Sequence, residues 1–173
     1  FTVIGIILAA VFVAMVISIL LSIFIWNPLE VGCQKFFINC KYGNAELGDI
    51  AYGFKNGYAH IGMIMFLRGL FTGLWMLLFI IPGIVKSYEY MMIPYLLAEH
   101  PEMTRQEAFA ESKQMMDGNK WDAFVLDLSF IGWTLLGVCT FGILLVFYVE
   151  PYIYLTRAEL YHALKNNNKS VEF

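Results

Sequence analysis

The chain has 173 residues, of which 60% are hydrophobic and 14% charged, with a net charge of −3 and a mean hydropathy of +0.66. Ordinary soluble domains are about a quarter charged, and a chain of this size cannot bury so much apolar surface internally. The composition therefore excludes an ordinary soluble protein, and the negative net charge gives no indication of a nucleic-acid partner. It predicts an all-α protein with several membrane-spanning helices.

The first segment, residues 1–26, contains no charged residue and no histidine. An apolar run of about 18 residues or more is typical of a membrane-spanning helix, so we expect a first span here. The run is too long for the apolar part of a secretory signal peptide and no positive charge precedes it. Asn27 and Pro28 then predict the cap and the first turn of a new helix.

The connection 27–57 has the spacing of two short amphipathic helices. Its apolar residues recur every three or four positions, first as Cys33, Phe36, Phe37 and Cys40, then as Leu47, Ile50, Ala51 and Phe54. Gly43 and Gly57 are expected to end the two helices. We expect both helices to lie on the membrane surface.

Residues 58–98 contain two apolar stretches, 58–81 and 84–98, on either side of Pro82-Gly83. Pro-Gly between apolar runs is typical of a turn and predicts a helical hairpin. A kinked continuous helix is the alternative, because membrane helices tolerate both residues. Gly69 and Gly73 form a GxxxG motif, which allows close helix approach in a dimer interface or inside the bundle.

The most polar segment is 99–120, where Thr104 and Glu107 have the spacing of a capping box. We expect an interfacial helix over 104–117 whose Phe109 and Met116 face the bilayer or the bundle.

The apolar stretches 121–139 and 143–164 predict a second hairpin over 121–165, followed by a loose polar tail, 166–173. A weak repeat of the residues around Trp75 near Trp133 indicates either duplication of the hairpin or chance. Together with the first span, these stretches predict about five spans.

The basic residues predict the orientation. If each stretch crosses once, nine of the 11 basic residues lie on one side: Lys35, Lys41, Lys55, Arg105, Lys113, Lys120, Arg157, Lys165 and Lys169. The positive-inside rule places both amphipathic connections and the C-terminus in the cytoplasm of a multi-pass cell-membrane protein. Cys139 is then expected near the outer face. The same rule places Phe1 outside, so we expect a further span before it.

Five ionisable residues lie in or near the apolar stretches: Arg68, Lys86, Glu89, Asp127 and Glu150. A charge at the centre of a lone membrane helix costs roughly 2.5–3.5 kcal/mol on insertion scales, so such residues need a partner or water. They form a candidate intramembrane polar network, with either a structural role, which we favour, or a role in an ion or substrate path. Arg68 and Asp127 differ in depth by about one helical turn, which predicts a contact between them.

The remaining reactive residues do not form a recognisable site. The three cysteines and three histidines lack metal-ligand spacing, and the sequence contains no HExxH, GxSxG or phosphate-binding glycine loop. We therefore expect no enzyme activity, no cofactor and no metal site.

Several motifs resemble those of a known family: LWMLLFIIPGI at 74–84, MMDGNK at 115–120, LDLSFIGW at 126–133 and Pro151-Tyr152. They are similar to the signature of a bacterial integral-membrane family, domain of unknown function 975, which is frequent in Gram-positive bacteria. The similarity covers nearly the whole chain from Asn27 onward. It implies a helical fold in the bacterial plasma membrane, and members typically carry a basic amphipathic segment and a further span ahead of this region. It implies no activity, because the family's biochemistry is not established.

Three functions fit this pattern. The leading interpretation is a non-enzymatic membrane scaffold or regulatory protein that acts in envelope stress. The alternatives are a small transporter or channel-like protein that uses the intramembrane charges, and a protein that protects against membrane-active peptides. The expected partners are the lipid bilayer and other membrane proteins or a second copy of the chain, and no nucleic acid.

Overall fold

The computed structural model describes residues 2–140 and 142–171, with the side chains of 4–140 and 142–167. Phe1, Phe141 and residues 172–173, which belong to the predicted first span, second hairpin turn and tail, lie outside the described residues. Within them all regular structure is helical, which confirms the predicted all-α fold. The elements are α1 (Thr2–Leu21), η1 (Ser22–Trp26), α2 (Asn27–Lys41), η2 (Leu47–Ala51), α3 (Tyr52–Lys55), α4 (Tyr58–Leu78), α5 (Ile80–Glu89), α6 (Ile93–Glu99), α7 (Arg105–Met116), α8 (Lys120–Ser129), α9 (Ile131–Cys139), η3 (Leu145–Val149) and α10 (Glu150–Val171).

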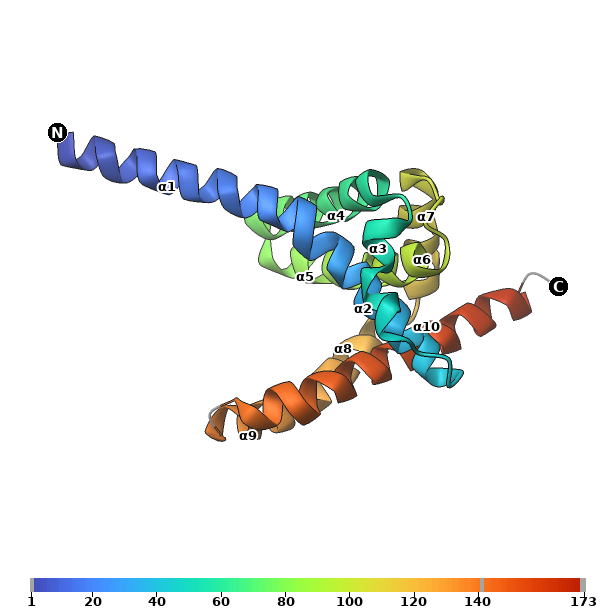
Figure 1. Cartoon of the computed structure of the whole chain (residues 1–173). Coiled ribbons are helices and arrows are strands. Elements are labelled where there is room, and N and C mark those ends of the chain that lie inside the picture. The colour runs from blue at the N-terminus through green and yellow to red at the C-terminus, as the bar shows by residue number, and fades with distance from the viewer. Residues whose placement is uncertain (1, 141, 172–173) are drawn as a thin grey trace.

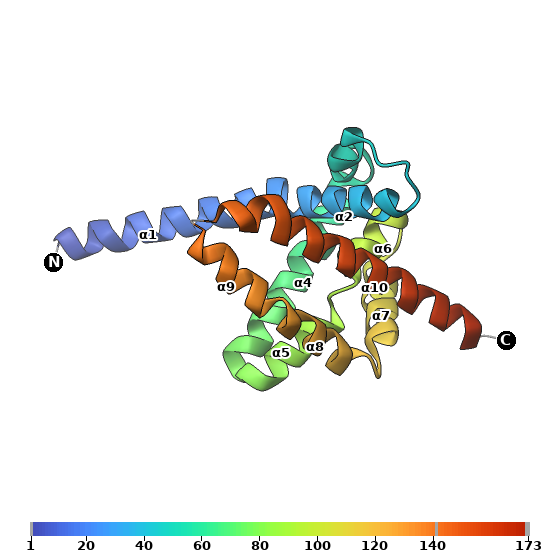
Figure 2. The ribbon, with the colours of Figure 1, turned by 90° about the horizontal axis from the view of Figure 1, so that it is seen from below.

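The helices form a body with three apolar projections (Figures 1 and 2). The body contains α2, α6, α7 and the second half of α10, whose side chains supply most of the buried core. Helix α1, the α4–α5 hairpin and the α9–α10 hairpin project from the body on one side, while the C-terminus and α7 lie toward the other side. The apolar surface is thus concentrated on one side of the molecule.

Helices α1 and α2 are continuous, so the predicted helix start at Asn27 and Pro28 is wrong. The helix passes Pro28 through the π-helical turn η1, in which the Asn27 N–H donates to the carbonyl of Ser22. Proline cannot donate to the carbonyl four residues earlier, which here belongs to Phe24. The Tyr58 hydroxyl donates to that carbonyl at 2.7 Å, so the missing backbone bond is replaced from α4.

The second part of this long helix, α2, is packed into the body, and the surface-lying position of this segment stays a prediction. Val31 is completely buried and Ile38 almost so, and α2 contacts α4, α6 and α10. The stop at Gly43 and the one at Gly57 are confirmed, since both residues have φ of 69°. The amphipathic spacing therefore predicted a helix correctly, and the apolar face of this helix packs against protein.

The first hairpin, α4–α5, turns at Phe79 and not at the predicted Pro82-Gly83. Phe79 is extended, with φ −152° and ψ 129°. Pro82 lies in the first turn of α5, where backbone N–H groups make no hydrogen bond within the helix, so proline is tolerated there. Gly83 permits the close approach of the two arms, because a Cβ there would lie 2.6 Å from the Met76 Cα. The second predicted stretch, 84–98, is likewise not one helix, since α5 ends at Glu89 and α6 begins at Ile93.

The second hairpin follows the prediction more closely. Helices α8 and α9 bend at Phe130, and the chain reverses after Cys139. The returning helix passes Pro151 through a second π-helical turn, η3, in which the Glu150 N–H donates to the carbonyl of Leu145. The predicted loose tail is helical as far as Val171.

Three helices of the described residues are long and apolar enough to cross a membrane: Ile4–Lys41, Tyr58–Leu78 and Lys120–Cys139. The sequence predicted about five spans. Helix α5 differs most from the predicted spans, because a helix of 10 residues is only about 15 Å long. These lengths and compositions are consistent with a membrane protein.

The predicted helix over 104–117 is confirmed with its capping box. The Glu107 N–H donates to the Thr104 hydroxyl at 3.4 Å, and the Thr104 N–H donates to a Glu107 carboxylate oxygen at 2.9 Å. Met116 is buried in the core, and the Phe109 ring lies edge-on to Phe71 and Tyr90. Helix α7 therefore packs against the hairpin α4–α5 through its apolar stripe.

We predict that Thr104→Ala lowers the free energy of unfolding by about 1 kcal/mol, the usual cost of losing an N-cap. The measurement is thermal unfolding of the detergent-purified protein. Thr156→Ala is the matched control, because the Thr156 hydroxyl only donates to a carbonyl within α10. An equal loss in both variants would contradict a specific role for the cap.

Candidate functional site

Four of the five predicted residues fall into three separate groups of polar contacts and not one network. Glu89 binds Lys86 and Lys120, Asp127 binds Arg157 and Tyr88, and Arg68 binds Glu30. Glu150 is exposed and takes part in none of the ion pairs found among the described residues. Sequence reasoning thus identified both members of the Glu89–Lys86 pair, and it missed Glu30, Lys120 and Arg157 as the partners in the other ion pairs.

Glu89, at the end of α5, is the most deeply buried of these acids, with its side chain 4% exposed. One carboxylate oxygen accepts from Lys86 at 2.8 Å and the other from Lys120 at 3.2 Å. The backbone carbonyl of Glu89 accepts from the buried Ser112 hydroxyl at 2.8 Å. Glu89 therefore joins the end of α5 to α7 and to the start of α8.

Asp127 pairs with Arg157 and not with Arg68, so the predicted Arg68–Asp127 contact is wrong. The Arg157 guanidinium donates to one Asp127 carboxylate oxygen at 2.9 Å, and the Tyr88 hydroxyl donates to the other at 3.0 Å. These bonds join α8, α10 and α5. Both carboxylate oxygens are occupied, which suits a structural tie between the two hairpins.

Arg68 binds Glu30, which sequence reasoning did not select. The distance is 2.9 Å and the pair joins α4 to α2, with side chains 24% and 40% exposed. Glu30 is the first charged residue after the apolar N-terminal run, and this position was the one sequence signal that could have identified it. The pair lines a cavity of about 380 Å³ between α2, α4 and α5, together with Thr72, Ser87 and other residues.

The Asp127–Arg157 pair lines a second cavity, of about 290 Å³, between α8, α9 and α10. Thr134 is the other polar residue in its wall, and Phe130, Ile131, Leu135 and Ile153 make the rest apolar. Each cavity therefore has a carboxylate–guanidinium pair beside apolar side chains. Such a lining can hold water or an amphiphilic molecule.

Several buried polar atoms at the centre of the body have no partner among the described residues. They are Gln34 Oε1, Tyr95 Oη, Arg157 Nε and His162 Nε2. The Tyr95 ring stacks on Tyr161 at 5.4 Å and is only 2% exposed. Internal water is the usual partner for such atoms. No sequence motif marks these residues, because their burial depends on how α2, α6 and α10 meet.

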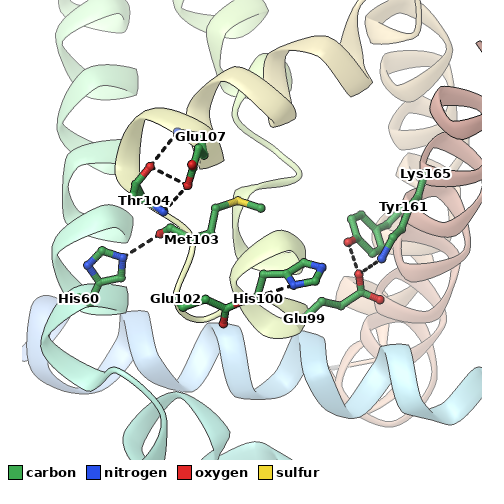
Figure 3. A network of polar contacts seen from close by, with 9 residues as sticks. All are labelled: His60, Glu99, His100, Glu102, Met103, Thr104, Glu107, Tyr161 and Lys165. Atoms are coloured by element: carbon green, nitrogen blue, oxygen red, sulfur yellow. Dashed lines mark hydrogen bonds and ion pairs between the residues drawn. The ribbon is translucent and has the colours of Figure 1, made fainter. Parts of the chain in front are cut away.

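A further polar network lies away from the apolar projections, around the segment that joins α6 to α7 (Figure 3). Glu99 accepts hydrogen bonds from Tyr161 and Lys165 of α10, and His60 of α4 contacts the Met103 carbonyl at 2.7 Å. Burial raises the pKa of the Glu99 carboxyl, but the bonds from Lys165 and Tyr161 outweigh burial and hold it below 4.5. Glu99 thus ties α6 to α10 as a carboxylate.

Comparison with known proteins gives a family and no biochemical precedent. Residues 3–168 match the family described as "Protein of unknown function (DUF975)". No curated protein and no solved structure matches the chain.

We predict that Asp127→Asn and Arg157→Gln each lower the free energy of unfolding by about 1–3 kcal/mol, the range for bonds to charged groups. The double variant should lose clearly less than the sum of the two, because the residues share one contact. Arg68→Gln is the control. The stability loss caused by Arg68→Gln should add to the loss caused by Asp127→Asn. Strong coupling between these two substitutions would instead support a contact between Arg68 and Asp127.

We also predict a pH dependence at Glu99. Because its pKa is lowered in the folded state, its stabilising contribution is complete above the unfolded value of about 4.5 and is lost as pH falls further. Glu99→Gln should therefore cost about 2 kcal/mol at pH 7. Melting curves from pH 7 to pH 3 should show the two proteins converging below about pH 4.5. Glu102→Gln, at a side chain that is 74% exposed, should have little effect, and a constant difference for Glu99→Gln at all pH values would contradict the assignment.

Proposed function

This chain belongs to the family described as "Protein of unknown function (DUF975)", and we propose that it is a non-enzymatic scaffold or regulatory protein of the bacterial plasma membrane. The apolar projections anchor it in the bilayer, and the helical body stands on the cytoplasmic side, where it meets other proteins and responds to envelope stress. The nine basic residues of the body and its connections support this orientation.

The proposal rests on how the carboxylates next to the apolar helices are bound by other side chains. The Glu89 carboxylate is bound by Lys86 of the same helix and by Lys120 of α8, and the Asp127 carboxylate is bound by Tyr88 of α5 and by Arg157 of α10. Ties of this kind hold helices in one arrangement, and a transport path instead needs groups that bind and release a substrate. The geometry therefore favours a fixed platform.

A surface suited to partner proteins is the outer face of α7. Arg105, Gln106, Lys113 and Gln114 are exposed there, opposite the stripe that enters the core. Charged side chains of this kind select partners by charge complementarity. We assign the regulatory contacts to this face.

Transport is the second candidate, and the cavity beside Glu30 and Arg68 is the observation that favours it. Arg68 donates one hydrogen bond to one Glu30 oxygen, and within the described residues the second oxygen has no partner. The pair thus has unused hydrogen-bonding capacity beside a cavity of about 380 Å³. A small polar solute or ion could use it.

We predict that the two candidate functions can be distinguished by expressing variants in a bacterial strain that lacks this gene and is exposed to membrane-active peptides or detergent. A scaffold requires α7, so Arg105→Glu/Lys113→Glu should abolish protection and Arg68→Gln should retain at least half of it. Immunoblots of the membrane fraction must show equal amounts of each variant. The reverse pattern, with a proton or ion flux in vesicles that Arg68→Gln removes, would contradict the scaffold and favour transport.

A further inference from the structure

We propose that α1 alone crosses the bilayer, and that both hairpins enter only the leaflet next to the helical body. The surfaces concerned are the first tip, residues 74–85, and the second tip, residues 131–140 and 142–148. Their partner is the acyl-chain region of one leaflet. The inference rests on the membrane role proposed above and specifies how the chain meets the lipid.

Helix α7 prevents the first half of α4 from lying in the hydrocarbon. It begins near His60, which contacts the Met103 carbonyl, and its Phe109 ring meets Phe71 at 5.8 Å. Helix α7 therefore meets α4 near its start and again through the contact between the Phe109 and Phe71 rings. The exposed face of α7 carries Arg105 and Lys113, and charged side chains facing lipid at that depth would each cost several kcal/mol.

What remains of the first hairpin is too short to cross. No charged residue occurs from Gly69 to Val85, so each arm has about eight uncharged residues, or roughly 12 Å of helix. Half of the hydrocarbon core is about 15 Å thick. The Lys86 ammonium lies 5.8 Å from the Trp75 ring centre, and this combination of a lysine and a tryptophan is typical of the headgroup level.

The second hairpin has similar dimensions. Residues 128–149 are uncharged, which gives about 11 residues per arm and roughly 16 Å of helix. At its base lies the Asp127–Arg157 pair, and the side chains beyond the pair are largely exposed, with Phe147 80% and Leu135 63% exposed. This tip also matches one leaflet.

Helix α1 differs from both hairpins. With η1 it provides 20 and 5 residues without a charge, or roughly 37 Å of helix, which exceeds the core thickness of about 30 Å. In both views α1 projects well beyond the tips of the two hairpins (Figures 1 and 2). If α1 spans the bilayer from the body, the tips end inside it.

This arrangement keeps both connections and the C-terminus on the side of the body, because each hairpin returns to the leaflet that it enters. It changes the position of Cys139, which lies at the second tip and near the bilayer midplane instead of at the outer face. It also places five helical segments in one leaflet and one in the other. The protein therefore occupies more area in the leaflet next to the body.

The test uses the full chain in lipid vesicles, with Cys33→Ser and Cys40→Ser as background and one cysteine at a time. The tip positions are Cys139 and Ile81→Cys, Lys113→Cys marks the body, and Ile4→Cys marks the far end of α1. All four positions are exposed, so labelling should not disturb the fold. An impermeant thiol reagent is added to one side of the membrane, and lipids brominated at known depths quench a thiol-attached fluorophore.

We expect no labelling of the two tip cysteines from either side, and strongest quenching by lipids brominated near the chain ends. Ile4→Cys should react from one side and Lys113→Cys from the other. Reaction of a tip cysteine from the same side as Ile4→Cys would overturn the inference and leave the membrane role intact. Disulfide cross-links between tips of two copies, without lipid quenching, would also overturn it. Absence of quenching at every position, with a mid-helix Val11→Cys included, would instead overturn the membrane role itself.

Discussion

A carboxylate next to long apolar segments must be paired, and this constraint decides how the helices of this protein meet. Glu30, Glu89 and Asp127 lie where apolar segments leave the body, and each binds a basic residue. Burial of an unpaired charge would cost several kcal/mol, so the helices can separate only at that cost. The pairs thus fix α2 on α4, α5 on α8, and α8 on α10.

The prolines place a second constraint on the same region. Pro28 and Pro151 interrupt helices that continue past them, and each follows a π-helical turn. At Pro28 the unpaired carbonyl is bound by Tyr58, so a residue that breaks a helix in isolation becomes a contact between two helices. Such turns persist because the surrounding helices satisfy the backbone. The long α1–α2 helix can therefore run from the exposed apolar projection into the core without a loop.

Local signals in the sequence predicted local structure well. The spacing of Thr104 and Glu107 located the start of α7, and Gly43 and Gly57 ended their helices as expected. Signals that depend on a neighbouring helix failed. Depth along a helix suggested an Arg68–Asp127 contact, but depth says nothing about rotation around the axis, and the side chains face Glu30 and Arg157 instead. Likewise, Asn27-Pro28 has a strong local preference for a helix start, which Tyr58 and the core contacts of α2 override.

Hydropathy alone does not separate apolar residues that pack on protein from apolar residues that stay exposed. A window over α4 sums residues such as Ile61 and Ile64, which are buried against protein, with residues such as Leu77, which is 87% exposed. Both kinds raise the hydropathy, but only the second kind stays uncovered by protein. Helix α1 has no buried face in its most apolar window, whereas 22% of the corresponding window of α4 is buried inside the protein. Which apolar face remains uncovered after the body has folded is therefore a property of packing and not of composition.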